Sequence, residues 1–249
     1  MATMPLLGVR RTAAVLLLVA GGPLAAQNID TGTPPPNAAW PKTPFGRPAG
    51  GTQFGSVGQS FTVEAGAATR LTDFQFWISN VDGFGAAQYH AYVFPWDAAT
   101  RRITGDFLFR SALQTGTDSP GPVPLSFATG GLDLVGGQRY IAVLSTAELA
   151  ATPAGTFGGL FESTAGANAD PYPGGAAYTL VSLYSAGLPG VVGGTWTVAG
   201  GNTSGHDFAF RAAFTTAAVT PIPEPSTVVL LGTGVLGVAL AVRRRRRAG

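Results

Sequence analysis

The chain has 249 residues, a formal net charge of +2, 45% hydrophobic and 11% charged residues, 36 Gly and 19 Pro. A low charged fraction with frequent Gly and Pro is typical of an all-β protein, and 10% aromatic residues argue against a disordered chain. Between residues 27 and 220, eight Lys and Arg stand against twelve Asp and Glu, a balance of about −4, so no nucleic-acid partner is expected. The absence of Cys excludes disulfides and thiolate metal sites.

Residues 1–26 predict a signal peptide. Two arginines precede the apolar run 12–20, which a Gly-Gly-Pro sequence ends. Ala26 then provides a small residue, so signal peptidase is expected to cut between Ala26 and Gln27. The alternative is a buried N-terminal helix, but nine apolar residues followed by Gly-Gly-Pro make a poor core helix.

Residues 27–55 predict an extended leader. They are rich in Pro, Gly and Asn, which favours little regular structure. Trp40 and Phe45 are the side chains in this leader that could dock onto the domain that follows.

Residues 56–217 predict a β-sandwich domain. Apolar and polar residues alternate in short runs, as in Phe74, Phe76 and Ile78 on one face of a strand. No segment has a convincing amphipathic helical period, and the Gly- and Ala-rich segment 146–177 predicts a long loop. About nine strands are expected: 59–63, 71–79, 89–94, 107–110, 124–128, 139–145, 178–183, 195–198 and 208–214. Short, evenly spaced strands of this kind indicate a two-sheet sandwich or a barrel, and we favour the sandwich.

The order of these elements resembles that of jelly-roll modules common in exported bacterial proteins. The stretches that carry the resemblance are 58–61, 71–78, 89–96 and 137–143. It implies an all-β, jelly-roll-like two-sheet sandwich. Because many such modules bind carbohydrate and others only build envelopes, it implies a fold more than a function.

Few residues in the domain have the pattern of catalytic or metal sites. His90 lies between aromatic residues and is expected to be packed. His206 and Asp207 precede the last strand, where Asp207 is expected to cap backbone amides; the alternative is half of a catalytic pair or a metal site. No nucleophile-elbow, zinc-protease or phosphate-loop motif is present, so no catalytic residue, metal ligand or cofactor is predicted. Calcium held by loop aspartates is the one ion left open.

Two tryptophans are candidate carbohydrate-binding residues. Trp77 lies opposite the apolar face of its strand, and Trp96 stands at a strand end beside Asp97. Aromatic rings beside polar groups bind sugars by stacking. The alternative is that Trp77 packs in a second layer and Trp96 plugs the end of the sandwich.

The chain ends with three segments in a fixed order: a Pro-rich linker, 218–227, an uncharged apolar run, 228–242, and an Arg-rich tail, 243–249. The run is short for a spanning helix, but arginines extend its reach by snorkelling. Since arginines are held on the cytoplasmic side, we expect a single transmembrane helix with the body outside. A buried strand or helix is the alternative, and the arginines beside it argue against that. The stop-transfer residues are Arg243, Arg244, Arg245, Arg246 and Arg247.

This C-terminal order resembles the PEP-CTERM sorting signal. The motif residues are Pro223, Glu224, Pro225, Ser226 and Thr227, preceded by Ile222 where Val is usual. The resemblance implies recognition by an exosortase, a membrane protease-transferase of Gram-negative bacteria that make exopolysaccharide and biofilm matrix. It implies transient anchoring at the inner membrane with the body in the periplasm, cleavage near the motif, and delivery to the cell surface or matrix.

The prolines suggest how such a signal could be read. They extend the backbone around Glu224 and remove two amide donors, so a protease cleft could bind the segment with little ordering cost. The alternative is a rigid spacer in which Glu224 is merely solvated.

Three functions follow from these patterns. The first is a non-catalytic cell-surface or extracellular-matrix protein, and the chain is accordingly not expected to be an enzyme. The second is a carbohydrate-binding module associated with exopolysaccharide, and the third is a secreted hydrolase.

Overall fold

A computed structural model describes the chain over residues 27–34, 42–47, 55–80, 88–116, 119, 121–149, 156–161, 170–181, 187–199, 206–216 and 243. The predicted signal peptide, the sorting motif and the predicted transmembrane helix, 228–242, lie outside the described residues.

The first sheet is organised around one long strand, β4 (Arg70–Asn80). β9 pairs with one edge of β4, while β14 and β11 pair with successive parts of the other edge. β1 and β2 lie beyond β14 and β11, and every pairing is antiparallel. The bounds are β1 (Asn28–Asp30), β2 (Lys42–Arg47), β9 (Val123–Asp133), β11 (Thr156–Phe161) and β14 (Phe210–Thr215).

The second sheet has the order β13-β12-β3-β10-β5, and three two-residue strands line the outer edge of β5. Its long central pairs, β10 with β3 and β10 with β5, are antiparallel. The bounds are β3 (Ser56–Thr62), β5 (Gln88–Asp97), β6 (Arg102–Ile103), β7 (Phe109–Arg110), β8 (Gln114–Thr115), β10 (Arg139–Ser145), β12 (Ala176–Leu180) and β13 (Thr197–Val198).

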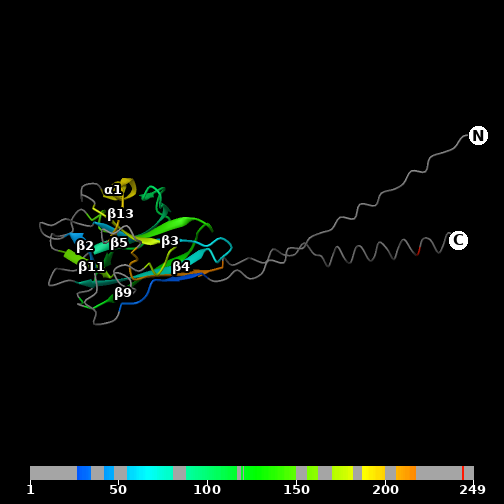
Figure 1. The fold of residues 1–249 in the computed structure, drawn as a ribbon, viewed down its shortest axis with the longest axis horizontal. Helices are drawn as coiled ribbons and strands as arrows, with labels where there is room; N and C mark the ends of the chain where they lie inside the picture. The colour runs from blue at the N-terminus through cyan, green and yellow to red at the C-terminus, as the bar shows by residue number, and fades with distance from the viewer. Residues whose placement is uncertain are drawn as a thin grey trace, which may run out of the picture.

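The two sheets pack face to face over a Phe-rich core (Figure 1). Alternation in β14 places Phe210 and Phe214 inward, where both rings meet Phe61 of β3 at 6.1 Å between centroids. Phe76 of β4 meets Phe210 at 5.0 Å. Aromatic pairs at these separations stabilise a core beyond the area that they bury.

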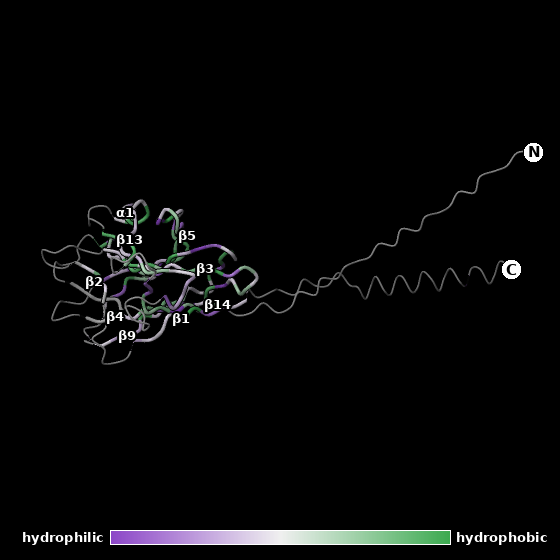
Figure 2. The backbone as a smooth tube through the Cα atoms, in the orientation of Figure 1, coloured by the Kyte–Doolittle hydropathy of each residue, from purple (hydrophilic) through white to green (hydrophobic). Residues whose placement is uncertain are grey.

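The second sheet is buried on its outer face as well. Tyr92 and Phe94 of β5 and Ile141 of β10 point away from the first sheet into a second apolar cluster. The short helix α1 (Gly187–Gly193) covers this cluster with Val191, and Trp196 is fully buried beside it. This explains why β5 is apolar on both faces. Figure 2 shows the hydrophobic, green stretches near β5 and α1.

The structure confirms a mostly β body with two sheets, and the jelly-roll topology stays a prediction. The face assignments of Phe74, Phe76 and Ile78 are confirmed, since all three lie in the shared core. Two expectations were wrong in part. The leader contains β1 and β2, and the expected loop 146–177 contains β11. Phe45 is fully buried in the shared core, which confirms the docking expected of it. Trp40 lies outside the described residues.

Candidate functional site

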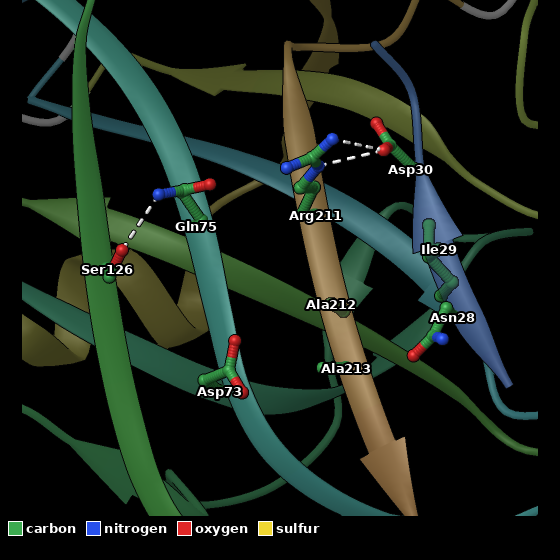
Figure 3. A pocket seen from close by; sticks show the side chains of 9 residues that line it. All are labelled: Asn28, Ile29, Asp30, Asp73, Gln75, Ser126, Arg211, Ala212 and Ala213. Carbon is green, nitrogen blue, oxygen red and sulfur yellow. Dashed lines mark hydrogen bonds and ion pairs between the residues drawn. The ribbon is translucent and has the colours of Figure 1, made fainter. Parts of the chain in front are cut away.

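The outer face of the first sheet carries a polar groove. The alternation that sends Phe74 and Phe76 into the core turns Asp73 and Gln75 outward. The groove has a volume of about 390 Å³ and crosses β9, β4, β14 and β1 (Figure 3). Its lining residues are Asn28, Ile29, Asp30, Asp73, Gln75, Ser126, Arg211, Ala212 and Ala213.

One cross-strand row of this groove is bonded as two separate pairs. Gln75 Nε2 donates to Ser126 Oγ at 2.8 Å. Arg211 places Nε and Nη2 each at 2.8 Å from Asp30 Oδ2, so this guanidinium and carboxylate neutralise each other. Figure 3 shows both pairs, with the side chains standing on four different strands.

The neighbouring row is open. In register, Ala213 of β14 lies between Asp73 of β4 and Asn28 of β1. The methyl group of Ala213 is too short to fill the space between its neighbours, and Figure 3 shows Asp73 and Asn28 on either side of it. Among the described residues, the structure shows Asp73 bonded to Thr72 of its own strand and no side-chain hydrogen bond that joins Asp73 or Asn28 to a neighbouring strand.

A double bulge sets the position of Asp73. The pairing of β4 shifts register next to Thr72 on both edges, against β9 and against β14. Thr72 Oγ1 lies 2.9 Å from Asp73 Oδ2 and 3.0 Å from the Ala213 carbonyl oxygen. Thr129 Oγ1 donates to the Leu71 carbonyl oxygen and holds the bulge from the other side. Bulges of this kind re-aim side chains and are frequent beside functional sites.

Trp77 borders the groove but does not present an open ring. Its side chain is 5% exposed, and the Arg211 guanidinium lies 5.7 Å above the ring centroid. A cation over the ring takes the face on which a sugar would stack. This placement corresponds to a ring packed in a second layer, and the stacking role of Trp77 stays a prediction.

Trp96 lines a second hollow at the end of β5, of about 490 Å³, with Asp97, Gln138 and Arg139. The indole is 5% exposed and packs on Tyr178 at 4.8 Å and on Trp196 at 6.1 Å between centroids. Among the described residues its Nε1 is the buried side-chain donor without a hydrogen-bond partner. This placement corresponds to a ring that plugs the sandwich end, and the stacking role of Trp96 stays a prediction.

The Asp97 carboxylate in this second hollow bonds residues of the turn that follows β5. Asp97 Oδ2 accepts from Thr100 Oγ1 at 2.7 Å, and Asp97 Oδ1 accepts from the Ala99 amide at 2.8 Å. These hydrogen bonds lower the pKa of Asp97, and the bond from the Thr100 hydroxyl has the largest effect. The carboxylate thus closes the turn after β5.

Asp207 is a buried carboxylate that joins three segments. It is 1% exposed, and its oxygens accept from Gln59 Nε2 at 2.5 Å and from the Tyr172 amide at 3.0 Å. Burial raises the pKa of Asp207 to about 7, against which the Gln59 and Tyr172 hydrogen bonds act. Asp207 does bond a backbone amide, as the sequence suggested, but from inside the body and across 35 residues.

His90 belongs to a polar cluster at the edge of β5. Its Nδ1 lies 3.0 Å from the Ser111 carbonyl oxygen, and its Nε2 lies 3.3 Å from Arg110 Nη2. Arg110 and Tyr92 both donate to Glu148 Oε2, at 2.5 and 2.8 Å. The cluster fastens the 107–113 segment to β5, which agrees with the packed role expected of His90.

Most of the predicted sorting residues lie outside the described residues. These are Ala26, Pro223 to Thr227 and Arg244 to Arg247, while Arg243 is described and exposed. Gln27 is buried at the start of the body, where Nε2 donates to the Thr62 carbonyl oxygen and Oε1 accepts from the Glu64 amide. Within the described segments, no three His, Cys, Asp or Glu residues gather as a metal site would require.

In the part of the chain that the structure describes, no helix has the length and apolar character needed to cross a membrane. The predicted span, 228–242, lies beyond that part.

Comparison with known proteins identifies the C-terminal segment. Residues 221–246 match the PEP-CTERM protein-sorting motif. The chain therefore carries the sorting signal of an exported protein, one whose sorting depends on an exosortase and is associated with the membrane. No curated protein matches the sequence.

Two solved structures have a distant resemblance to the body. One is a clostridial cysteine protease, Cwp84, after propeptide cleavage, at 14% identity and a TM-score of 0.41 over 71% of this chain and 40% of that one. The other holds the cysteine protease and lectin-like domains of Cwp84, a surface layer associated protein of Clostridium difficile. It matches at 17% identity and a TM-score of 0.40, over 66% of this chain and 32% of that one. This chain thus spans well under half the length of either.

Proposed function

We propose that this chain is a non-catalytic cell-surface or extracellular-matrix protein that an exosortase delivers to its destination. The observation that carries the proposal is the PEP-CTERM match at residues 221–246. The matched segment contains the apolar run 228–242 and four of the five arginines that follow it. Arginines held on the cytoplasmic side place the β-body outside.

The route has three steps. Signal peptidase cleaves after Ala26, and the helix 228–242 then holds the body in the periplasm against the inner membrane. The exosortase next cleaves near Glu224 and releases the body to the surface or matrix. Gln27 suits this order, since the first residue of the processed chain is already bonded into the body.

A non-catalytic role is supported by how the described polar residues are used. Asp207 and His90 bond backbone groups of neighbouring segments, and Glu148 accepts from Arg110 and Tyr92. Each of these groups therefore has a structural use in the body.

The substitution Glu224→Gln tests the recognition step. It removes the one charge of the motif and keeps its shape, so we expect the membrane-bound, uncleaved form to accumulate about tenfold. Immunoblots of membrane and surface fractions measure the ratio of the two forms. Asp106→Asn, at an exposed carboxylate of the body, is the matched control and should process as wild type. Equal processing of Glu224→Gln and wild type would show that Glu224 is only a solvated spacer residue.

A carbohydrate-binding module is the second candidate. The observation in its favour is the groove on the first sheet, where polar side chains on rigid strands surround an open row. Sites built on strands hold their groups more accurately than sites on loops.

A further inference from the structure

We propose that the groove of the first sheet binds a neutral saccharide, with Asp73 and Asn28 bonding its hydroxyl groups from opposite sides of Ala213. The inference rests on the proposed function, because an exported body is the one that meets polysaccharide. It replaces stacking on Trp77 or Trp96 by hydrogen bonding in a groove.

The contrast between the two rows selects the ligand-binding groups. In one row, Gln75 bonds Ser126 and Arg211 bonds Asp30, so each side chain has a partner on a neighbouring strand. Asp73 and Asn28 flank an alanine, and no such bridge joins them. Asp73 Oδ2 accepts from Thr72 Oγ1, which leaves Oδ1 of this exposed carboxylate for a ligand. Polar groups without a partner on a neighbouring strand can bond a ligand without breaking a contact of the sheet.

The width of the open row fits one sugar ring. The backbones at Asp73 and Asn28 are two strand spacings apart, or about 10 Å. A hydroxyl-bearing ring over Ala213 would lie between the two side chains, each of which can form a hydrogen bond of about 2.8 Å to it. Ala213 supplies the small apolar floor, and the bonded row forms one wall (Figure 3).

Charge decides against an acidic ligand. Arg211 is neutralised by Asp30, which leaves Asp73 as the unpaired charge among the lining residues. A carboxylate accepts hydrogen bonds strongly from hydroxyl groups but repels uronates and sulfates. A neutral polysaccharide is therefore the class that the groove fits.

The backbone supplies an independent argument. The pairing of β4 with β9 and with β14 shifts register at Thr72, next to Asp73. Bulges bend a strand and re-aim its side chains, and here the re-aimed side chain is Asp73.

The test uses the full-length protein purified in detergent and a panel of soluble polysaccharides. Dextran, galactomannan and xyloglucan are the neutral members, and alginate is the acidic one. Affinity electrophoresis measures the retardation of each variant at graded polysaccharide concentrations. Two variants address the groove: Asp73→Asn removes the charged acceptor, and Ala213→Leu fills the floor.

We expect at least one neutral polysaccharide to retard the wild type, and each groove variant to weaken binding by about tenfold or more. Gln138→Ala, in the hollow beside Trp96, is the matched control and should bind as wild type. A melting curve for each variant separates lost binding from lost folding.

Three results on the wild type and the groove variants would overturn the inference. They are no retardation on any neutral member, binding to alginate alone, or wild-type affinity in a folded Asp73→Asn or Ala213→Leu protein. Weakening by Gln138→Ala alone would move the site to the second hollow and also overturn it. A protein that reaches the surface without binding polysaccharide would contradict only the proposal that the groove binds a saccharide, and the sorting proposal would stand.

Discussion

At the scale of single residues, Asp207 is a carboxylate held almost entirely away from water. It is almost fully buried, yet it bonds Gln59 and the Tyr172 amide, which join β3 to the segment before β12. Nothing in the local sequence, a His-Asp pair before a strand, indicates this depth. Burial came from packing across the sandwich, which a single strand pattern does not encode.

This environment predicts an unusual pH dependence of stability. The pKa of Asp207 is about 7 in the folded protein, raised by burial from an ordinary 3.8. The folded state therefore binds this proton more tightly than the unfolded state does. The free energy of unfolding should rise as pH falls from about 7 toward 4, by a few kcal/mol at most, with the gain complete below the ordinary pKa. Urea unfolding between pH 5 and 8 measures it.

Asp207→Asn removes the titrating group, and its unfolding free energy should vary much less over the same range. Asp106→Asn, at an exposed carboxylate, should keep the wild-type slope. If the wild type and Asp207→Asn show the same slope, the buried carboxylate is not the group responsible.

At the scale of elements, the close contact between β12 and β3 depends on one glycine. A Cβ atom at Gly175 would lie 1.9 Å from the Ser60 carbonyl oxygen, which is backbone and cannot rotate away. Gly175→Ala should therefore lower the free energy of unfolding by about 2–3 kcal/mol. Urea unfolding followed by tryptophan fluorescence measures the loss, because Trp196 is fully buried.

Gly193→Ala is the matched control, since nothing lies within 4 Å of the added Cβ at the end of α1. It should change stability by no more than about 0.5 kcal/mol. Equal effects of the two substitutions would contradict the contact between Gly175 and Ser60.

Strands with strong alternation were predictable, and strands without it were not. Phe208 to Phe214 and Leu71 to Ile78 alternate clearly, and their inward faces are those expected. β2 contains Pro and Gly, and β11 contains two Gly in a row. Both strands are in the sheet because they pair with neighbouring strands, although their own sequences lack an alternating apolar pattern. The helix α1 contains Pro189, and it is held by packing of Val191.

The groove was missed for a related reason. Asp73, Asn28 and Ala213 are far apart in sequence, and only the register of β4, β14 and β1 brings them together. The sequence directed attention to tryptophans, which the structure buries at 5% exposure. A signal was present in the outward residues of 71–79, since Asp73 and Gln75 lie opposite the apolar face.

At the scale of the whole molecule, the sequence was most informative where order along the chain is the signal. Linker, apolar run and arginines at the C-terminus need no tertiary contact to be recognised, and residues 221–246 match the sorting motif. The β-body depends on pairing between strands far apart in sequence, such as β1 and β14, so the binding groove becomes visible only in the structure.

Fractionation of the epitope-tagged protein, with and without residues 221–249, tests the central claim most directly. The full chain should pass through the inner membrane and reach the surface or matrix as a shortened form. The truncated chain should lose the membrane intermediate and its delivery to the surface, and accumulate in the periplasm. The same distribution for both proteins, or a full chain that stays in the cytoplasm, would contradict exosortase-dependent sorting.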